Sequence, residues 1–305
     1  MMKAELAKAA IAAALLVLSA CGQKKTESPA PAGDAAGPAM WRVTDEDSTA
    51  YLFGTFHILP ESVEWKTAAF DAAMRETATT VTEVDVKSPA AQAEMSKLVT
   101  ELGLNPTGVT LSALLGPTRA VRFAAITERY GLPMSAFEQM KPWLAMITLS
   151  VSIMQKEGFD ADSGAEEAIL KRAESEKDAI AHLESAEYQV RALASLSEDE
   201  ILADFDASLQ EYENFDVYAK RMLEAWTEGD VDALEKETLS EMRRKAPDAF
   251  RILISDRNEN WAREIEAMMA GDENYFIAVG AGHLIGEGSV VERLKARGFA
   301  VERVQ

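Results

Sequence analysis

The chain contains only three histidines, and two of them share a local setting that could support chemistry. His57 and His283 each stand three residues after a glycine, Gly54 and Gly280, where a β-prone segment ends. A glycine at such a point lets the backbone turn sharply or approach another group closely. In open α/β sheets, ligands bind beyond the carboxyl ends of the strands. We therefore expect both imidazoles to project into one crevice.

An acidic pair follows the first of these histidines. Glu83 and Asp85 lie within the segment 81–86, VTEVDV, which is predicted to be a strand, so both carboxylates share one of its faces. Acids in a buried strand are costly without partners, and the structural alternative is a solvent-facing edge. Two imidazoles and a carboxylate can hold a divalent metal with a position open for water. They can equally act as general acid and base without a metal.

The two ends of the folded region have the same predicted pattern of elements. At the first end, a hairpin over 41–53 leads through Gly-x-x-His to a helix over about 62–76 and a strand over 79–86. At the second end, a strand over 275–279 leads through Gly-x-x-His to a helix over 290–297 and a strand over 299–304. We predict an α+β fold whose central mixed sheet is built from two strand–GxxH–helix–strand repeats, with right-handed crossovers between parallel strands.

A long helical insertion is predicted between the two repeats, from about residue 90 to 270. Pro142 marks one helix start, and Ser163 with Glu166 and Ser197 with Glu200 fit the capping box of two more. A short strand is expected around 180–183. The residues after it include three polar side chains that we interpret as the polar start of a helix, with a supporting role at the site as the alternative: Glu184, Glu187 and Gln189.

The first forty residues have the composition of an export signal and a tether. Residues 9–18 are apolar but too few to span a bilayer, which needs roughly 20, and such a run is typical of a signal peptide. Cys21 is the only cysteine, so it cannot form a disulfide within the chain. The segment Leu18-Ser19-Ala20-Cys21 resembles the lipobox of bacterial lipoproteins. We expect a signal peptide over 1–20, a flexible tether over 21–40 and a folded domain over 41–305.

Charge and motif spacing bear on the partners. The net charge of −20 argues against nucleic acid as a partner, because binding phosphates needs basic patches. Attachment to a membrane is expected through the lipid on Cys21. The residue after this cysteine is Gly22 and not Asp, which resembles the pattern of lipoproteins sorted to the outer membrane, so we expect the domain to face the periplasm. The spacing GxGxxxG at 280–286 differs from the dinucleotide GxGxxG, so no nucleotide cofactor is expected. The sequence contains no GxSxG motif of a serine hydrolase.

Several short motifs together resemble one known family. They are GTFH at 54–57, TEVD at 82–85, Pro142-Trp143, HLESAEYQ at 182–189, Arg257-Asn258-x-x-Trp261 and VGAGHL at 279–284. In order and spacing they resemble the TraB/GumN family (TraB/PrgY/GumN), whose animal relatives include the Tiki metalloproteases. His182 stands where this family commonly has glycine, so no catalytic role is carried over to it.

The resemblance implies an α+β fold and a metal-dependent hydrolase, here a peptidase acting on an envelope protein. It implies that His57, Glu83 and His283 bind a divalent metal such as Mn²⁺, Co²⁺ or Zn²⁺, with Glu83 as third ligand or base. Asp85, on the same strand face as Glu83, would orient one of the metal-binding side chains without binding the metal itself. Arg257 would steady an oxyanion or anchor a substrate carboxylate, beside Asn258 of the same motif. The alternative is a non-catalytic envelope protein for binding or assembly, linked to polysaccharide production.

The lipobox generates a test of the anchor. Cys21→Ser should block lipidation and leave the chain unprocessed or soluble, because the modified thiol is the attachment point. Mass spectrometry of the mature N-terminus checks this, and an unmodified Cys21 in the wild-type protein would contradict it.

Overall fold

The computed structural model describes residues 37–305. The predicted signal peptide, Cys21 and most of the predicted tether lie outside the described residues. Residues 37–40, which were expected in the tether, are buried, and the first strand starts at Met40. Within the described part of the chain, no helix combines the length and apolarity needed to cross a membrane.

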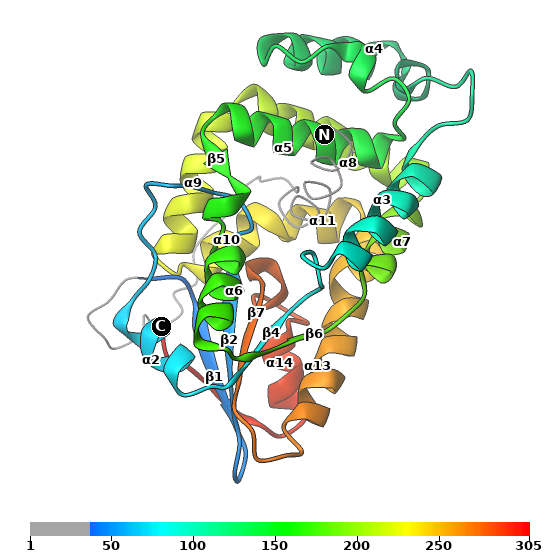
Figure 1. The fold of residues 1–305 in the computed structure, drawn as a ribbon. Coiled ribbons are helices and arrows are strands. Elements are labelled where there is room, and N and C mark those ends of the chain that lie inside the picture. Colours follow the sequence, from blue (N-terminus) through cyan, green and yellow to red (C-terminus); the bar gives the residue numbers. More distant parts are fainter. Residues whose placement is uncertain (1–36) are drawn as a thin grey trace.

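A six-stranded mixed sheet forms the lower half of the molecule in Figure 1, in the order β6-β4-β7-β2-β1-β8. Its strands are β1 (Met40–Thr44), β2 (Thr49–Thr55), β4 (Thr79–Thr82), β6 (Ala179–His182), β7 (Tyr275–Gly280) and β8 (Ala300–Arg303). The four strands β6, β4, β7 and β2 are parallel, and β1 pairs antiparallel with both β2 and β8. The strands expected near 51–56, 79–85 and 275–280 therefore lie in one sheet, as predicted.

A largely helical region lies beyond the end of the sheet at which β2 and β7 finish (Figure 1). The helices are α2 (Ala68–Arg75), α3 (Pro89–Gly103), α4 (Leu111–Arg129), α5 (Pro142–Lys156), α6 (Ala165–Glu176), α7 (Ala186–Ala194), α8 (Glu198–Glu213), α9 (Phe215–Thr227), α10 (Val231–Thr238), α11 (Ser240–Lys245), α12 (Pro247–Phe250), α13 (Asp256–Met268) and α14 (Val290–Ala296). Two short strands, β3 (Leu59–Pro60) and β5 (Phe159–Asp160), pair antiparallel. Single turns cover Met134–Ala136, Ala161–Ser163, Arg251–Ser255 and Ala281–His283.

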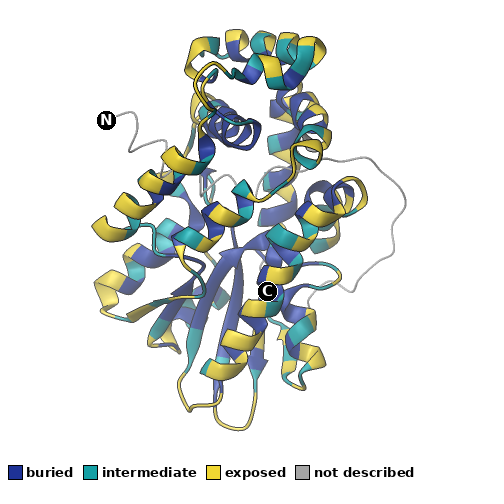
Figure 2. Ribbon diagram, turned by 90° about the vertical axis from the view of Figure 1, so that its right-hand side faces the viewer, coloured by how far each residue is buried: buried dark blue, intermediate teal, exposed yellow. Residues whose placement is uncertain are grey.

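Helices cover both faces of the sheet, so its central strands are buried (Figures 1 and 2). Every residue of β2 after Thr49 and of β7 after Tyr275 is buried. One face carries an aromatic cluster in which Phe53 contacts Trp65, Phe70 and Phe276 with ring centroids 5.3 to 6.0 Å apart. Burial on both faces explains why these strands are nearly continuous apolar runs.

Two predicted elements are shorter in the structure than in the sequence analysis. The strand expected over 79–86 ends at Thr82, and the chain bends at Glu83, whose carboxylate accepts the backbone N–H of Gly280. The helix expected from about residue 62 begins at Ala68, because Thr67 accepts from the Phe70 N–H and caps its first turn. The apolar and β-branched residues of a segment do not by themselves show where its strand or helix begins and ends.

The ends of β2 and β7 lie in close contact. In register, Gly54 is opposite Val279, and a Cβ at position 54 would lie 3.1 Å from both Cα and Cβ of Ala281. The carbonyl of Gly54 accepts the buried indole N–H of Trp226 from α9 at 2.8 Å. Glycine at position 54 therefore lets the two Gly-x-x-His turns approach each other and lets α9 dock on them.

This close approach generates a prediction about stability. Gly54→Ala should lower the free energy of unfolding by about 1 to 3 kcal/mol, because the new methyl group forces backbone to shift. Gly282→Ala is the matched control in the other turn, since its Cβ would meet only Leu239 at 3.6 Å, an ordinary contact. Urea unfolding of both variants measures the difference, and equal stabilities would contradict the account.

Candidate functional site

The structure brings three of the predicted site residues to the same edge of the sheet. Glu83, His283 and His57 directly follow β4, β7 and β2, which are neighbouring parallel strands. Adjacent strands are about 4.8 Å apart, so groups at their carboxyl ends are close. Glu83 and His283 are fully buried, and the side chain of His57 is 12% exposed. His57 is therefore the member of this set that is nearest to solvent.

Both oxygens of Glu83 accept hydrogen bonds from the protein. Oε1 accepts from the backbone N–H of Gly280 at 2.8 Å. Oε2 accepts from Arg257 Nη2 at 2.7 Å and from the side-chain amide of Gln189 at 3.1 Å. Three donors from three elements thus fix this buried carboxylate, as a buried charge requires.

Arg257 is the hub of the cluster. Its guanidinium, 5% exposed, lies between Glu83 and Glu184, and it contacts both oxygens of Glu184. The indole N–H of Trp261 donates to the same Glu184 at 3.1 Å. Arg257 Nη1 donates to the Leu253 carbonyl at 3.1 Å. The guanidinium donors are used by acceptors of the protein itself, which gives Arg257 a positioning role in this structure.

The tautomer of His283 follows from its partners. Asn258 Nδ2 donates to the Gly288 carbonyl at 3.0 Å, so its Oδ1 faces the imidazole and accepts from His283 Nδ1–H at 2.6 Å. The proton therefore resides on Nδ1, and the Nε2 lone pair accepts from Arg257 Nη1 at 3.1 Å. The ring also packs on Trp261, with centroids 4.3 Å apart.

The Nδ1 atom of His57 faces a carboxylate, whereas that of His283 faces an amide. The Nδ1 of His57 lies 3.0 Å from Glu166 Oε2, in the first turn of α6, which is ion-pairing distance. Its Nε2 is buried and has no hydrogen-bond partner among the described residues. Glu166 was expected to close a capping box with Ser163, and that prediction is wrong, because α6 has no side-chain cap and Glu166 turns to His57. The capping box of Ser197 and Glu200 is confirmed.

The pKa values of the two histidines are shifted in opposite directions. Burial lowers the pKa of His57, but the carboxylates of Glu166 and Glu83 outweigh burial, so the pKa is raised above its ordinary 6.5. Burial, then the positive charge of Arg257 and of His57, lowers the pKa of His283 well below 6.5. His283 is therefore neutral near pH 7, and the two imidazoles are close enough to influence each other.

Other predicted residues lie outside this cluster. Asp85 accepts from the backbone N–H groups of Lys87 and Ser88, both at 2.9 Å, and shapes the turn before α3. His182 ends β6 and contacts the Thr82 hydroxyl through Nδ1 at 2.9 Å. Glu187 forms an exposed pair with Arg191. The strand that would align Asp85 with Glu83, and so with His57 and His283, ends at Thr82.

Three residues of the cluster were missed or undervalued by sequence reasoning. Glu184 and Gln189 were interpreted as the polar start of a helix, yet both contact Arg257 or Glu83. Glu166 was assigned to a cap. A turn of π-helix, Arg251–Ser255, precedes Arg257 and Asn258, a device often found at functional sites. A single π-helical turn is not marked by the apolar periodicity or the capping residues from which helices are predicted.

The side chains of His57, His283 and Glu83 are of the types that bind a divalent cation, but in this structure they are not arranged around a common metal position. Across residues 37–305, no group of three or more His, Cys, Asp or Glu is arranged to hold a metal ion. Between Glu83 and His283 lies the guanidinium of Arg257. In favour of a cation, the Nε2 of His57 is unpaired, the Nε2 of His283 carries a lone pair, and both Nδ1–H groups are anchored, as in metal-binding histidines.

The family of the chain is evident from comparison with known proteins. A model of the TraB/PrgY/gumN family matches residues 39–303. The uncharacterized protein YbaP of Escherichia coli (strain K12) is 28% identical over 173 residues, 56% of this chain and 62% of the relative, and YbaP of Shigella flexneri gives the same values. The matched region spans less than two thirds of these relatives. No solved structure matches the chain.

The paired histidine and carboxylate generate a prediction for pH. Nuclear magnetic resonance of the imidazole protons should show His57 titrating above 6.5, while His283 stays neutral to far lower pH. Glu166→Gln should lower the pKa of His57, because it removes the nearest negative charge. Stability from this pair is complete below the unfolded pKa of about 6.5 and is lost as pH rises through the folded pKa. Unchanged titration of His57 in the variant would contradict the pairing.

The buried ion pair generates a second prediction. Glu184→Gln should lower the free energy of unfolding by about 2 to 3 kcal/mol, because a charged hydrogen bond to buried Arg257 is lost. Glu187→Gln, three residues along, breaks an exposed pair and should cost under about 1 kcal/mol. Thermal or urea unfolding compares the two, and equal losses would show that Glu184 contributes no more than a surface charge.

Proposed function

We propose that this chain, which belongs to the TraB/PrgY/gumN family, is a metal-dependent hydrolase that cleaves peptide bonds in the cell envelope. One observation carries the proposal. Each Gly-x-x-His imidazole is anchored through Nδ1, by Glu166 or by Asn258, which leaves Nε2 as the atom available to a ligand. His283 is neutral, the form in which histidine binds metals, and metal binding at His57 would release the proton that its raised pKa retains.

The charge of the cluster supports a bound cation. The carboxylates of Glu83 and Glu184 pair with the guanidinium of Arg257, and a third carboxylate, Glu166, pairs with His57. The pKa of Glu184 is raised because burial outweighs its contact with Arg257, and the pKa of His57 is raised as well. For His57 the cause is the negative charge of Glu166 and Glu83. A divalent cation bound beside these carboxylates would compensate that charge, and its binding would release protons.

The metal-binding role requires Arg257 to give up one contact. Its Nη1 donates to the Nε2 of His283, and its Nη2 donates to Glu83. Binding through the Nε2 of His283 therefore competes with this arginine. The bidentate contact with Glu184 provides a place where the guanidinium stays paired. We accordingly assign Arg257 to positioning and charge balance rather than to direct contact with substrate.

In the proposed reaction, His57 and His283 hold the ion, and Glu83 is a third ligand or the base. A bound divalent cation supplies a Lewis acid for the scissile carbonyl and lowers the pKa of water. The chain's own residues keep the site in order. Asn258 and Glu166 fix the two imidazole orientations, and the backbone N–H of Gly280 fixes the carboxylate of Glu83.

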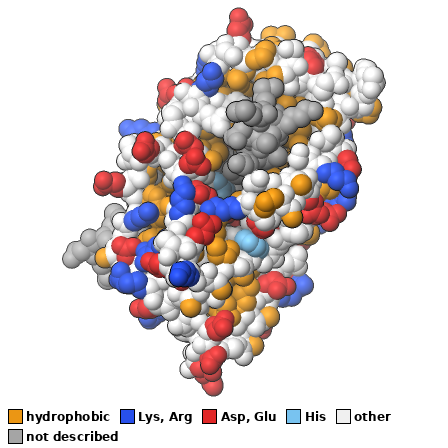
Figure 3. All heavy atoms as spheres, in the orientation of Figure 1, with side chains coloured by type: hydrophobic (Ala, Val, Ile, Leu, Met, Phe, Trp, Pro, Cys, Tyr) orange, Lys and Arg blue, Asp and Glu red, His pale blue; other side chains and the backbone are white. Residues whose placement is uncertain are grey.

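Three further parts of the proposal concern architecture and location. We interpret the two strand–Gly-x-x-His segments, at β2 and β7, as copies of one repeat separated by the helical insertion. We propose that the chain is exported and lipid-anchored at Cys21, in the outer membrane facing the periplasm. On the face seen in Figure 3, acidic and basic side chains of the described residues are interspersed with hydrophobic ones. Nucleic acid and nucleotide cofactors remain outside the proposed partners.

Metal binding and cleavage give the central prediction of this proposal. Calorimetry with Mn²⁺, Co²⁺ and Zn²⁺ should detect binding that His57→Ala and His283→Ala each weaken by at least tenfold, since each removes a ligand. His182→Ala is the matched control, a histidine at the end of another parallel strand that lies outside the cluster. Digestion of a peptide library should show cleavage that both site variants lose and the control keeps.

Glu83→Gln separates the two roles of the carboxylate. An amide oxygen can still accept the Gly280 N–H, but it accepts a proton far less readily. Retained metal binding without cleavage identifies Glu83 as the base, and loss of both identifies it as a ligand. Metal binding by the wild-type protein without any cleavage would favour the alternative, a non-catalytic envelope protein for binding or assembly, linked to polysaccharide production. A folded wild-type protein that binds no metal would overturn the proposal.

A further inference from the structure

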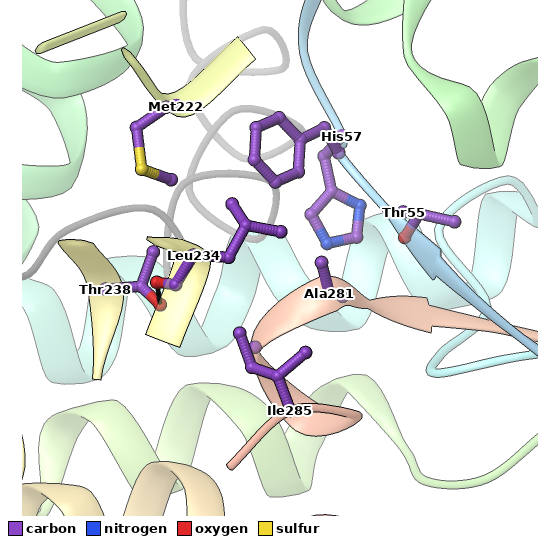
Figure 4. Close-up of a pocket in the computed structure, with 10 residues that line it drawn as sticks. Thr55, His57, Met222, Leu234, Thr238, Ala281 and Ile285 are labelled. Carbon is purple, nitrogen blue, oxygen red and sulfur yellow. Dashed lines mark hydrogen bonds between the residues drawn. The ribbon is translucent and has the colours of Figure 1, made fainter. Parts of the chain in front are cut away.

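A small pocket adjoins His57, and most of its wall is apolar (Figure 4). Phe56 follows β2, Met222 lies on α9, Leu234 lies on α10, and Ile285 follows the turn after β7. All four are less than a tenth exposed, and Phe56 stacks on Trp226. The pocket therefore lies between the Gly-x-x-His turns and the helical region, on the side of the cluster that is closest to solvent.

Two polar atoms in the wall of this pocket have no partner. Thr55 Oγ1 and His57 Nε2 are both buried without a hydrogen bond among the described residues. The third polar group, the hydroxyl of Thr238, is already satisfied by the Leu234 carbonyl at 2.6 Å. Buried polar atoms are rarely left unpaired, so two of them in one small pocket indicate a ligand with a polar edge.

The size of the pocket limits what it can take. Only about 10 Å³ is open to the centre of a water molecule, which is room for about one water or a methyl group. Met222 is unbranched, and its three rotatable bonds let it shift for a group slightly larger. Gly280, Ala281 and Gly282 also line the pocket, and at the two glycines a ligand can approach the main chain closely.

We infer that this pocket binds one small apolar side chain of the substrate, of the size of alanine, next to the bond that is cleaved. The hydroxyl of Thr55 pairs with the neighbouring peptide group. The inference rests on the proposed function for the identity of the ligand as a substrate. Figure 4 shows Thr55 and His57 on one side of the pocket, opposite Leu234, Thr238 and Met222.

Binding can be measured without metal and without turnover. The full-length chain has three histidines, so the imidazole resonance of His57 is a resolvable probe of the pocket. The ligands are the N-acetyl methylamides of alanine, valine, phenylalanine and aspartate. The alanine compound should shift the His57 resonance saturably. The phenylalanine and aspartate compounds should bind at least roughly tenfold more weakly, because one is too large and the other would bury a charge, and the valine compound should bind between these limits.

Two variants test the wall directly. Met222→Ala should enlarge the pocket and improve binding of the phenylalanine compound relative to alanine by roughly tenfold. Ile285→Val removes a single methylene and should shift preference toward valine, with less risk to folding. Met269→Ala is the matched control, since Met269 is equally buried but contacts the β1–β2 turn at the opposite end of the sheet.

Equal shifts of His57 with all four compounds would overturn the inference, and so would a change of preference in Met269→Ala as large as in Met222→Ala. The proposed function fails separately. Selective binding of small apolar compounds by a protein that cleaves no peptide would support the pocket and contradict the hydrolase activity. Cleavage of peptides with no preference for small apolar residues would contradict the pocket and support the hydrolase activity.

Discussion

A single buried guanidinium organises the end of the sheet. Arg257 pairs with Glu83 after β4 and with Glu184 after β6, and it donates to His283 after β7. Burying ions costs several kcal/mol each unless the geometry satisfies nearly all of their hydrogen bonds. These contacts reach the ends of three parallel strands from one helix, so the arrangement of the strands, the bend at Glu83 and the docking of α13 depend on one another.

The charged cluster also sets the protonation of its members. Burial raises the pKa of Glu184, and the carboxylates of Glu166 and Glu83 raise the pKa of His57 against the effect of burial. Asn258 accepts from Nδ1 of His283, and Glu166 lies at ion-pairing distance from Nδ1 of His57. The side chain of His57 is 12% exposed, whereas Glu83, Arg257 and His283 are buried.

Sequence reasoning recovered the elements that local chemistry controls. The Gly-x-x-His turns, the hairpin over 41–53, the helix starting at Pro142 and the common sheet all follow from glycine, proline and apolar runs. The partners of the charged groups did not follow from it. Glu166 lies 109 positions after His57, and Glu184 lies 73 positions before Arg257, so only the fold decides that they meet. The alternation that placed Asp85 beside Glu83 failed because tertiary contacts end the strand at Thr82.

The central claim is that the Nε2 atoms of His57 and His283 bind one divalent cation in competition with Arg257. A crystal structure of the protein with Mn²⁺, Co²⁺ or Zn²⁺, recorded at the absorption edge of the metal, tests this most directly. The account predicts one anomalous peak about 2.0 to 2.2 Å from both Nε2 atoms, with the guanidinium retained on Glu184 and withdrawn from His283. A peak elsewhere, or no peak while Arg257 still donates to His283, would contradict it.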